Sequence, residues 1–388
     1  MEKFNLSKME NLNKINKLLK IFFHEKKIKK NIEWSRIERV LVVDMTLIGD
    51  TVMLVPFLEE LKKNAPVAQI DLVCGKWGNI LLGEQGLVNR FYHMTGDKLE
   101  TPSKMMRNFK AIYKTLKEIR KTKYDVIIEP RGDVRYIFFM HWCKGKRKIS
   151  YNYTGGECLL TDVVQPNYDL EHLVDDKLYL LSQIGCKVSG NRAPRLHKTG
   201  SFDEFKKQYF ERHELDGKII LGIHPGASIA IKQWDKYPEL LKRISEGDKE
   251  KLYVIVFSGP GEEVIAQSVY ESAASSGVKV SLSKTGLEEY IKLLALCDCV
   301  ICNDSGAGHI AAAYGAEVIC IMGPFCPEFC APISERVYPL SVDVKCKPCL
   351  SKECKMQSME CIKAISVEDV LSVWKNTQCV NDVYKEDL

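Results

Sequence analysis

Residues 39–50 read RVLVVDMTLIGD, and this stretch indicates how the chain folds. Residues 40–43 are apolar and mostly β-branched, which is typical of a parallel-sheet strand that is covered on both faces. Residues 51–64 have a helical pattern, and residues 68–74 form a second apolar run. A strand, a helix and another strand in succession predict a doubly wound α/β domain.

The same alternation continues along the chain and then starts again. The pattern predicts two α/β domains, one over residues 37–195 and one over residues 215–388, preceded by an N-terminal extension over residues 1–36. Residues 188–217 predict the connection between them, and the second domain carries a cysteine-rich tail. Further strands are expected at 126–128, 149–151, 219–224, 253–258, 299–302 and 317–322, and helices at 107–121, 172–184, 201–213, 237–245, 286–296, 307–314 and 367–374.

Composition excludes several classes of protein. The chain has 388 residues, of which 45% are hydrophobic and 28% charged, as in soluble globular proteins. No apolar run approaches the roughly 20 residues that a membrane span needs, and we find no signal-peptide pattern. An odd number of scattered cysteines, 15 in all, predicts reduced thiols in a cytoplasmic protein.

The net charge of +5 is confined to the N-terminal extension. Residues 1–36 hold ten Lys or Arg and four Asp or Glu, so the rest of the chain is close to neutral. This balance disfavours a nucleic-acid-coating surface. Residues 5–30 predict an amphipathic helix whose apolar positions share one face; they are Met9, Leu12, Ile15, Leu19 and Phe22. Such a helix fits two roles equally: peripheral binding to the anionic inner face of a membrane, or packing on its own domain or a second subunit.

Four loops follow predicted strands, where open α/β sheets bind ligands. In the first, we expect Gly49 to let the backbone turn tightly after the strand. Asp50 then lies at the start of a helix, where it is either a helix-capping residue or a general base. In the second loop, residues 224–228 expose backbone N–H groups and include Ser228, while Lys232 offers a positive charge to a phosphate.

The other two loops also have the composition of anion or ribose sites. Residues 303–309 place small residues at the start of a helix, where free N–H groups bind phosphate. His309 is either a hydrogen-bond donor to a bound anion or a hydrogen-bonded core histidine. In residues 258–263 an acidic side chain either holds ribose hydroxyls or simply favours the first helical turn.

Together these motifs resemble glycosyltransferase family 9, the lipopolysaccharide heptosyltransferase family. The resemblance covers about residues 38–375. It is carried by residues 40–50, 124–128, 132–149, 224–234, 303–309 and Gly323-Pro324.

The resemblance implies a GT-B fold, with two Rossmann-like domains facing across a cleft. It further implies an inverting transfer of a heptose or related sugar from a nucleotide-diphosphate donor, expected to be ADP-heptose, to lipopolysaccharide core or another lipid-linked glycan. Asp50 matches the general base, and Gly49 and Arg135 lie on the acceptor side. The residues that match the donor site are Ser228, Lys232, Glu262 (or Glu263), Asp304, Ser305, Gly306, Ala307 and His309.

The resemblance leaves other functions open. The acceptor could be a protein such as a surface adhesin, the enzyme could be a sugar-nucleotide epimerase of the same fold, or the chain could be a non-catalytic nucleotide-sugar-binding subunit. Backbone amides and one lysine can stabilise a leaving diphosphate without a catalytic cofactor.

The tail carries a separate motif. Its spacing is C-x2-C-x4-C-x6-C, formed by Cys346, Cys349, Cys354 and Cys361. Four thiolates this close in sequence can hold a structural zinc or iron ion, although they can equally be a loop of reduced thiols. Four earlier cysteines lie in apolar runs and are expected in the core: Cys297, Cys299, Cys302 and Cys320.

Overall fold

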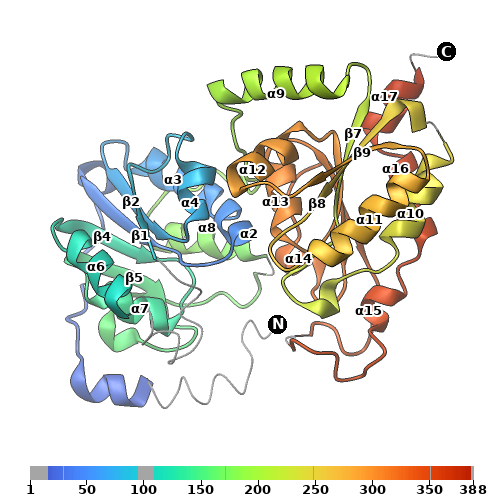
Figure 1. Cartoon of the computed structure of the whole chain (residues 1–388). Helices are drawn as coiled ribbons and strands as arrows, with labels where there is room; N and C mark the ends of the chain where they lie inside the picture. Colours follow the sequence, from blue (N-terminus) through green and yellow to red (C-terminus); the bar gives the residue numbers. More distant parts are fainter. Residues whose placement is uncertain are drawn as a thin grey trace. The chain divides into compact units, whose positions relative to one another are not determined.

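The computed structural model describes residues 16–28, 30–94, 109–170, 172–247, 249–349 and 351–385. The chain divides into two compact units, Met1–Arg192 and Ala193–Leu388. In each unit, a central sheet is flanked by helices (Figure 1). The described part of the N-terminal extension belongs to the first unit, and the polar segment after residue 193 belongs to the second.

The first unit is built on a six-stranded parallel sheet. Strand β1 has four fully buried apolar residues, as its sequence predicts. The strands in spatial order are β3 (Arg90–His93), β2 (Gln69–Cys74), β1 (Arg39–Val43), β4 (Tyr124–Glu129), β5 (Gly145–Tyr151) and β6 (Asp162–Val164). This order reverses between β1 and β4, and ligands bind at such reversals in doubly wound sheets.

The second unit repeats this topology. Its sheet is also parallel, and the order reverses between β7 and β10. The strands in spatial order are β12 (Val337–Ser341), β11 (Glu317–Met322), β10 (Cys299–Asn303), β7 (Ile219–His224), β8 (Leu252–Phe257) and β9 (Lys279–Ser283). The structure therefore confirms the expected fold class, with two Rossmann-like α/β domains.

Helices connect the strands in both units. Several begin with a side-chain cap; in α16, Ser366 and Asp369 form a reciprocal capping box. The helices of the first unit are α2 (Ile48–Val52), α3 (Val55–Asn64), α4 (Trp77–Leu82), α6 (Phe109–Ile119), α7 (Val134–His141) and α8 (Leu173–Gln183). Those of the second are α9 (Gly200–His213), α10 (Tyr237–Ser245), α11 (Glu263–Ser275), α12 (Leu287–Leu296), α13 (Gly306–Ala313), α14 (Pro327–Cys330), α15 (Glu360–Lys363), α16 (Val367–Lys375) and α17 (Gln378–Lys385).

The sequence patterns predicted the four inner strands of each sheet and missed the outer ones. The missed strands are β3, β6, β9 and β12, which form the two edges of the two sheets. Edge strands lie partly in solvent, so they lack a continuous apolar run; β12 even contains Pro339, which an edge tolerates.

The expected helix over residues 5–30 is wrong in its second half. Within the described residues the helix ends at residue 22, and residues 23–28 run without regular structure. These residues pack on the first unit instead: the N–H groups of Glu25 and Ile28 donate to the carbonyls of Cys158 and Thr161. Such long-range hydrogen bonds replace those of a longer helix.

The apolar face of this helix also differs from the expectation. Leu19 is buried in the first unit's core, with Phe23 packed against it, but Phe22 is 75% exposed. Leu18 and Ile21 are exposed as well. The positions Met9, Leu12 and Ile15 lie outside the described residues.

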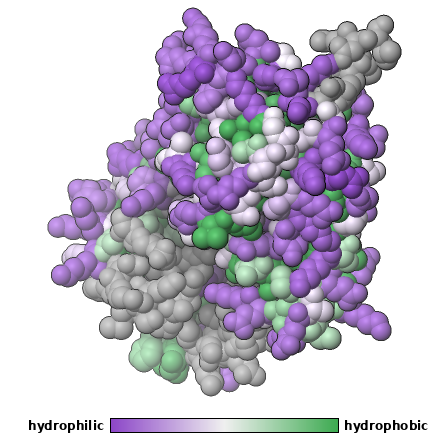
Figure 2. Space-filling model, turned by 45° about the vertical axis from the view of Figure 1, so that its right-hand side comes forward, coloured by the Kyte–Doolittle hydropathy of each residue, from purple (hydrophilic) through white to green (hydrophobic). Residues whose placement is uncertain are grey.

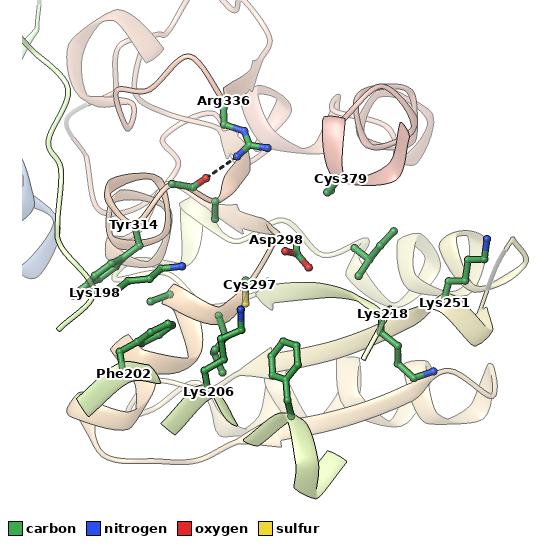
Figure 3. Close-up of a pocket in the computed structure, with 17 residues that line it drawn as sticks. Lys198, Phe202, Lys206, Lys218, Lys251, Cys297, Asp298, Tyr314, Arg336 and Cys379 are labelled. Carbon is green, nitrogen blue, oxygen red and sulfur yellow. Dashed lines mark hydrogen bonds between the residues drawn. The ribbon is translucent and has the colours of Figure 1, made fainter. Parts of the chain in front are cut away.

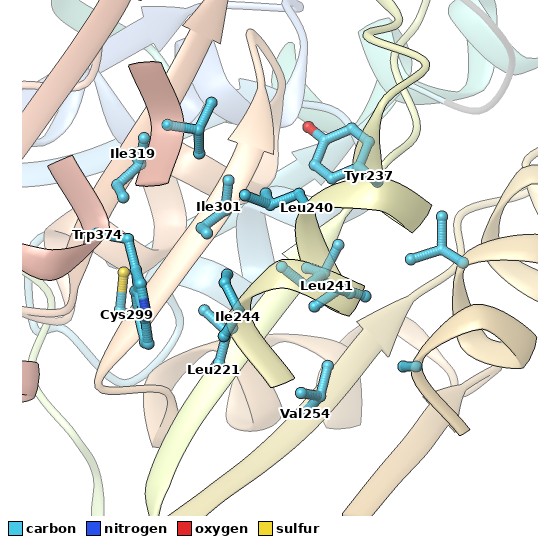
Figure 4. Close-up of a cluster of buried hydrophobic side chains, with 14 of the residues drawn as sticks. Leu221, Tyr237, Leu240, Leu241, Ile244, Val254, Cys299, Ile301, Ile319 and Trp374 are labelled. Atoms are coloured by element: carbon cyan, nitrogen blue, oxygen red, sulfur yellow. The ribbon is translucent and has the colours of Figure 1, made fainter. Parts of the chain in front are cut away.

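The core of the second unit lies between its sheet and the helices that cover it. Figure 4 shows Ile244 of α10 near the strand residue Leu221, and Leu240 near Ile301. Trp374 of α16 belongs to the same cluster, so the tail helix packs on the sheet of its own unit. The four cysteines expected in the core are buried, as predicted.

Hydrophilic side chains cover most of the described surface in the view of Figure 2, and apolar side chains form small patches between them. Among the described residues, none of the helices has the length and apolar composition required to cross a membrane.

Candidate active site

Asn303 organises the reversal point of the second sheet. It is the last residue of β10 and is fully buried. Its amide nitrogen donates to the carbonyls of Pro225 (2.7 Å) and Gly226 (3.2 Å), which follow β7. Its amide oxygen accepts from the Trp234 N–H and the Tyr237 hydroxyl, both at 3.1 Å. One side chain therefore fixes the loop after β7 to the end of β10.

Glu262 reaches this loop from the end of β8. Its carboxylate accepts from the Gly259 N–H (3.0 Å) and lies 3.5 Å from Nε2 of His224. Gly226 passes so close that a Cβ there would overlap the Glu262 carboxylate. By contrast, Glu263 is exposed and accepts from the Gly261 N–H. Of the two carboxylates left open by the sequence, Glu262 is the one beside the β7 loop.

His224 ends β7 and is buried. Burial lowers the pKa of its imidazole, and the nearby Glu262 carboxylate opposes this shift in part. Its Nδ1 lies 3.4 Å from the Ser305 hydroxyl. A neutral histidine here joins the loops of three neighbouring strands without adding a charge.

Lys232 supplies the positive charge of the site. It ends a short 3₁₀ turn, Ala230–Lys232, and its Nζ donates to Asp304 at 2.6 Å. The ammonium also lies 4.4 Å from the centre of the Phe325 ring. The two charged side chains are 13% and 8% exposed, so an arriving anion would meet a lysine that is already held in place.

Helix α13 begins at this same edge of the sheet. Ser305 is its N-cap residue and makes no side-chain cap, while Gly306 and Ala307 form the first turn. First-turn N–H groups have no partner within a helix, which makes them available to an anion. His309 is buried one turn further on, and Ser228 is exposed in the β7 loop.

Asp50 lies at the corresponding reversal point of the first sheet. It is in the first turn of α2, where its carboxylate accepts from the Leu47 N–H at 3.2 Å. The Arg131 guanidinium, from the loop after β4, is 3.8 Å away. Gly49 has no left-handed backbone and lies buried inside α2, so our expectation that it makes the tight turn is wrong.

Two buried carboxyl groups, at the ends of β1 and β4, are neighbours of Asp50 and Arg131. Burial raises the pKa of Asp44, whose Oδ2 has no hydrogen-bond partner among the described residues. Burial also raises the pKa of Glu129 to about 8. Glu129 accepts from the Gly132 N–H and the Ser150 hydroxyl, so it fixes the loop that carries Arg131.

The guanidinium of Arg135, a residue expected on the acceptor side, pairs with a neighbouring carboxylate. Arg135 lies on α7, and its partner is the N-cap residue Asp133. Burial alone would lower the pKa of Arg131, but the carboxylates of Asp50 and Asp44 raise it overall. Arg131 is therefore the cation beside Asp50.

The chain was compared with known proteins. Residues 112–360 match the sequence model of "Glycosyltransferase family 9 (heptosyltransferase)", which is more than half of the chain. This chain belongs to glycosyltransferase family 9. It is accordingly a transferase enzyme.

Curated relatives and solved structures agree with the family. Lipooligosaccharide heptosyltransferase 2 of Campylobacter jejuni is 25% identical over 339 residues, which cover 85% of this chain and 95% of that protein. The crystal structure of a family 9 glycosyl transferase from Veillonella parvula has a TM-score of 0.75 at 18% identity, covering 91% of this chain and 99% of that one. The ADP-heptose lps heptosyltransferase II of Escherichia coli has a TM-score of 0.69 at 19% identity, covering 90% and 100%. At these identities the two structures show that the fold is shared.

The sequence reasoning gave no role to four residues of this family 9 enzyme. They are Asp44, Glu129, Arg131 and Asn303. Each ends a central strand or follows one within two residues, and that position was the available signal. Their importance comes from contacts with loops that are distant in sequence. Asn303 and Pro225, for example, are separated by 78 positions along the chain.

The four tail cysteines of this family 9 enzyme lie near one another. Burial raises the pKa of Cys361, and the charges of Cys346, Cys354 and Cys349 raise it further. In the part of the chain that the structure describes, however, no three Cys, His, Asp or Glu side chains are placed so that they could hold a metal ion. As arranged here, the cysteines do not fit a metal.

Proposed function

We propose that this enzyme transfers heptose from ADP-heptose to lipopolysaccharide core or a related lipid-linked glycan, with inversion at the sugar carbon. The names of the relatives support this choice: lipooligosaccharide heptosyltransferase 2 in Campylobacter jejuni and lipopolysaccharide heptosyltransferase 3 in Escherichia coli. The observation that carries the donor part is the convergence of Lys232, Asp304 and the amino end of α13 at one reversal point.

In this proposal the second unit binds the donor. The first-turn amides from Ser305 to Ala307 and the Lys232 ammonium hold the diphosphate, and stabilise its charge as the bond to the sugar breaks. Asp304 positions Lys232 and lies beside the sugar. Glu262 accepts hydrogen bonds from the ribose hydroxyls. His309 and Ser228 complete the proposed donor site.

The first unit binds the acceptor. Asp50 removes the proton from the acceptor hydroxyl as its oxygen attacks the sugar carbon, and the diphosphate leaves with the bonding electrons. The Arg131 guanidinium lies 3.8 Å from this carboxylate and pairs with it. Arg135 and Gly49 remain proposed acceptor-side residues, and capping of α2 by Asp50 is compatible with its role as base.

Kinetics of the variant Asp50→Asn test the proposal. We expect kcat for heptose transfer to fall by about 10²–10⁴-fold while ADP binding stays unchanged, since a general base contributes about that much. The variant Asp169→Asn, at an exposed position of the same unit, is the matched control. Unchanged turnover in Asp50→Asn would remove the base from the proposal.

Incubations with donor alone and with donor plus candidate acceptors separate the alternatives. Conversion of the nucleotide sugar to an epimer without acceptor would indicate an epimerase, and labelled protein rather than glycan would indicate an adhesin-type acceptor. ADP binding with no transfer to any acceptor would indicate a non-catalytic subunit.

We also propose that the enzyme acts in the cytoplasm at the inner face of the inner membrane. Leu18, Ile21 and Phe22 are exposed on the N-terminal helix, beside Lys17 and Lys20. Replacing the three apolar residues with Ser should abolish sedimentation with anionic vesicles and leave transfer to a soluble acceptor unchanged. Equal sedimentation would contradict the proposal.

A structural zinc or iron at the four tail cysteines rests on their spacing alone, and it has no part in the reaction. Metal analysis of the purified protein tests it. About one ion per chain that is lost in Cys346→Ser/Cys349→Ser and kept in Cys379→Ser would support it; a metal-free wild type would contradict it.

A further inference from the structure

The second unit has a cavity at the edge of its sheet opposite the proposed donor site. Its volume is about 610 Å³, which is within the range of small-molecule sites. It lies at the amino ends of the strands, beside Ile219 at the start of β7 and Asp298 just before β10. The donor site lies at the carboxyl ends of the same strands, about 15–20 Å away along strands of five or six residues.

Basic side chains dominate this cavity. Its lining includes Lys198, Lys206, Lys218, Lys251 and Arg336, against one carboxylate, Asp298. Figure 3 shows Lys198, Lys206 and Arg336 around Cys297 and Asp298, from three different segments of the chain. Burial raises the pKa of Asp298, and these three cations oppose that shift. The cations are therefore close enough to act on one common point.

Asp298 offsets at most one of these five positive charges. Its carboxylate accepts from the Ile220 N–H at 2.8 Å, and so has a structural role at the start of the sheet. Neither Lys198 nor Lys206 forms an ion pair within the part of the chain that the structure describes. Burial lowers the pKa of Lys198, and the charge of Lys206 lowers it further. An anion between the two ammonium groups would remove this repulsion.

Aromatic rings form part of the wall beside these lysines. The Lys198 Nζ is 5.0 Å from the centre of the Phe202 ring, and the Lys206 Nζ is 5.2 Å from that of Phe210. Ala295 and Leu296 contribute further apolar surface. A ligand that fits this lining carries both a negative group and an apolar or aromatic part.

Arg336 completes the group but also has a structural role. Its Nη1 donates to the Gly315 carbonyl at 3.1 Å, just beyond α13, as basic side chains near helix carboxyl ends often do. Its Nη2 donates to Gln378 at 3.3 Å and lies 3.9 Å from the Glu317 carboxylate, so this cation is already partly paired. Its Nε is buried with no hydrogen-bond partner among the described residues.

We propose that this cavity binds a phosphate ester, with the phosphate between Lys198, Lys206 and Arg336 and the apolar or aromatic part against Phe202 and Phe210. It is a second anion site, separate from the donor site and independent of the proposed function. The ester could be a soluble metabolite or a lipid headgroup, since both present the same chemistry to the three cations.

Calorimetry with phenyl phosphate tests the site. We expect wild-type binding to weaken at least ~10-fold in Lys198→Ser/Lys206→Ser, because charged hydrogen bonds are lost, and to change less than ~2-fold in Lys207→Ser. Lys207 is exposed on the same helix and does not line the cavity, so it controls for net charge. Lys206→Ser alone, at an exposed position, gives a smaller loss if the double variant folds poorly.

Two further arms complete the test. Sedimentation with phosphatidic acid vesicles that depends on Lys198 and Lys206 assigns a lipid source, and phenyl phosphate binding without it assigns a soluble one. Equal binding by the wild type and the double variant overturns the proposal. So does binding that is lost in Lys232→Met and kept in the double variant, because the phosphate would then be at the donor site.

Discussion

The two units have the same strand order but different chemistry at the point where that order reverses. In the first unit, the strands at the reversal end in the buried carboxyl groups of Asp44 and Glu129, whose pKa values are raised. In the second, the corresponding position is held by an uncharged amide, Asn303, with four hydrogen bonds. Topology thus places a site at the reversal, and the side chains at the strand ends decide its chemistry.

Converting the amide into a carboxyl group is the strongest test of this difference. Asn303→Asp leaves the carbonyls of Pro225 and Gly226 without a donor and buries a charge, so we expect a loss of about 3 kcal/mol in the free energy of unfolding at pH 8. The loss should shrink toward pH 5, because burial raises the pKa of the new carboxyl group. Urea unfolding at both pH values measures it. Asn381→Asp, exposed on α17, is the control; a loss as small as the control's would contradict the role of Asn303.

Removing the charge of the second site comes next in size. Lys232→Met should weaken ADP binding by about 10–100-fold, because a charged hydrogen bond to the diphosphate is lost. Lys242→Met, exposed on α10, should leave the ADP dissociation constant unchanged. Calorimetric titration measures both, and equal affinities would exclude Lys232 from the donor site.

The carboxyl group of Glu129 predicts a pH dependence that is specific to the first unit. Its folded pKa is about 8, whereas the unfolded value is 4.5, so the folded state holds a proton that the unfolded state releases between these values. Stability should therefore fall as pH rises from about 5 to 8, by at most about 1.4 kcal/mol per pH unit.

Glu129→Gln should remove most of this slope, since the amide cannot release a proton. Hydrogen exchange at the β4 amides, measured from pH 5 to 8, reports this pH dependence of stability. The amides of β10 in the second unit are the internal control. A slope that persists in Glu129→Gln would assign the dependence to another group, such as Asp44.

The smallest effect separates two adjacent carboxylates in the second unit. Glu262→Gln should weaken ADP binding by about 5–10-fold, because the ribose loses a charged acceptor. Glu263→Gln should change it by less than about 2-fold, since Glu263 is exposed and away from the β7 loop. A larger effect of Glu263→Gln than of Glu262→Gln would assign the ribose contact to Glu263.

The sequence alone determined the inner strands, most of their helices and the loops that carry Asp50, Lys232 and Ser305. Continuous apolar runs and helix-start residues are local signals, and they are present whatever the rest of the chain does. The resemblance to the family rested on these same loops.

Only the tertiary structure decided the rest. The edge strands lack an apolar run because they face solvent. Residues 23–28 do not continue the N-terminal helix, because their N–H groups donate to carbonyls of another segment. Arg131 lies beside Asp50, and Asn303 beside Pro225, because parallel pairing brings distant strand ends together. Burial, and with it the raised pKa of Glu129, depends on neighbours from several segments, and no local pattern records them.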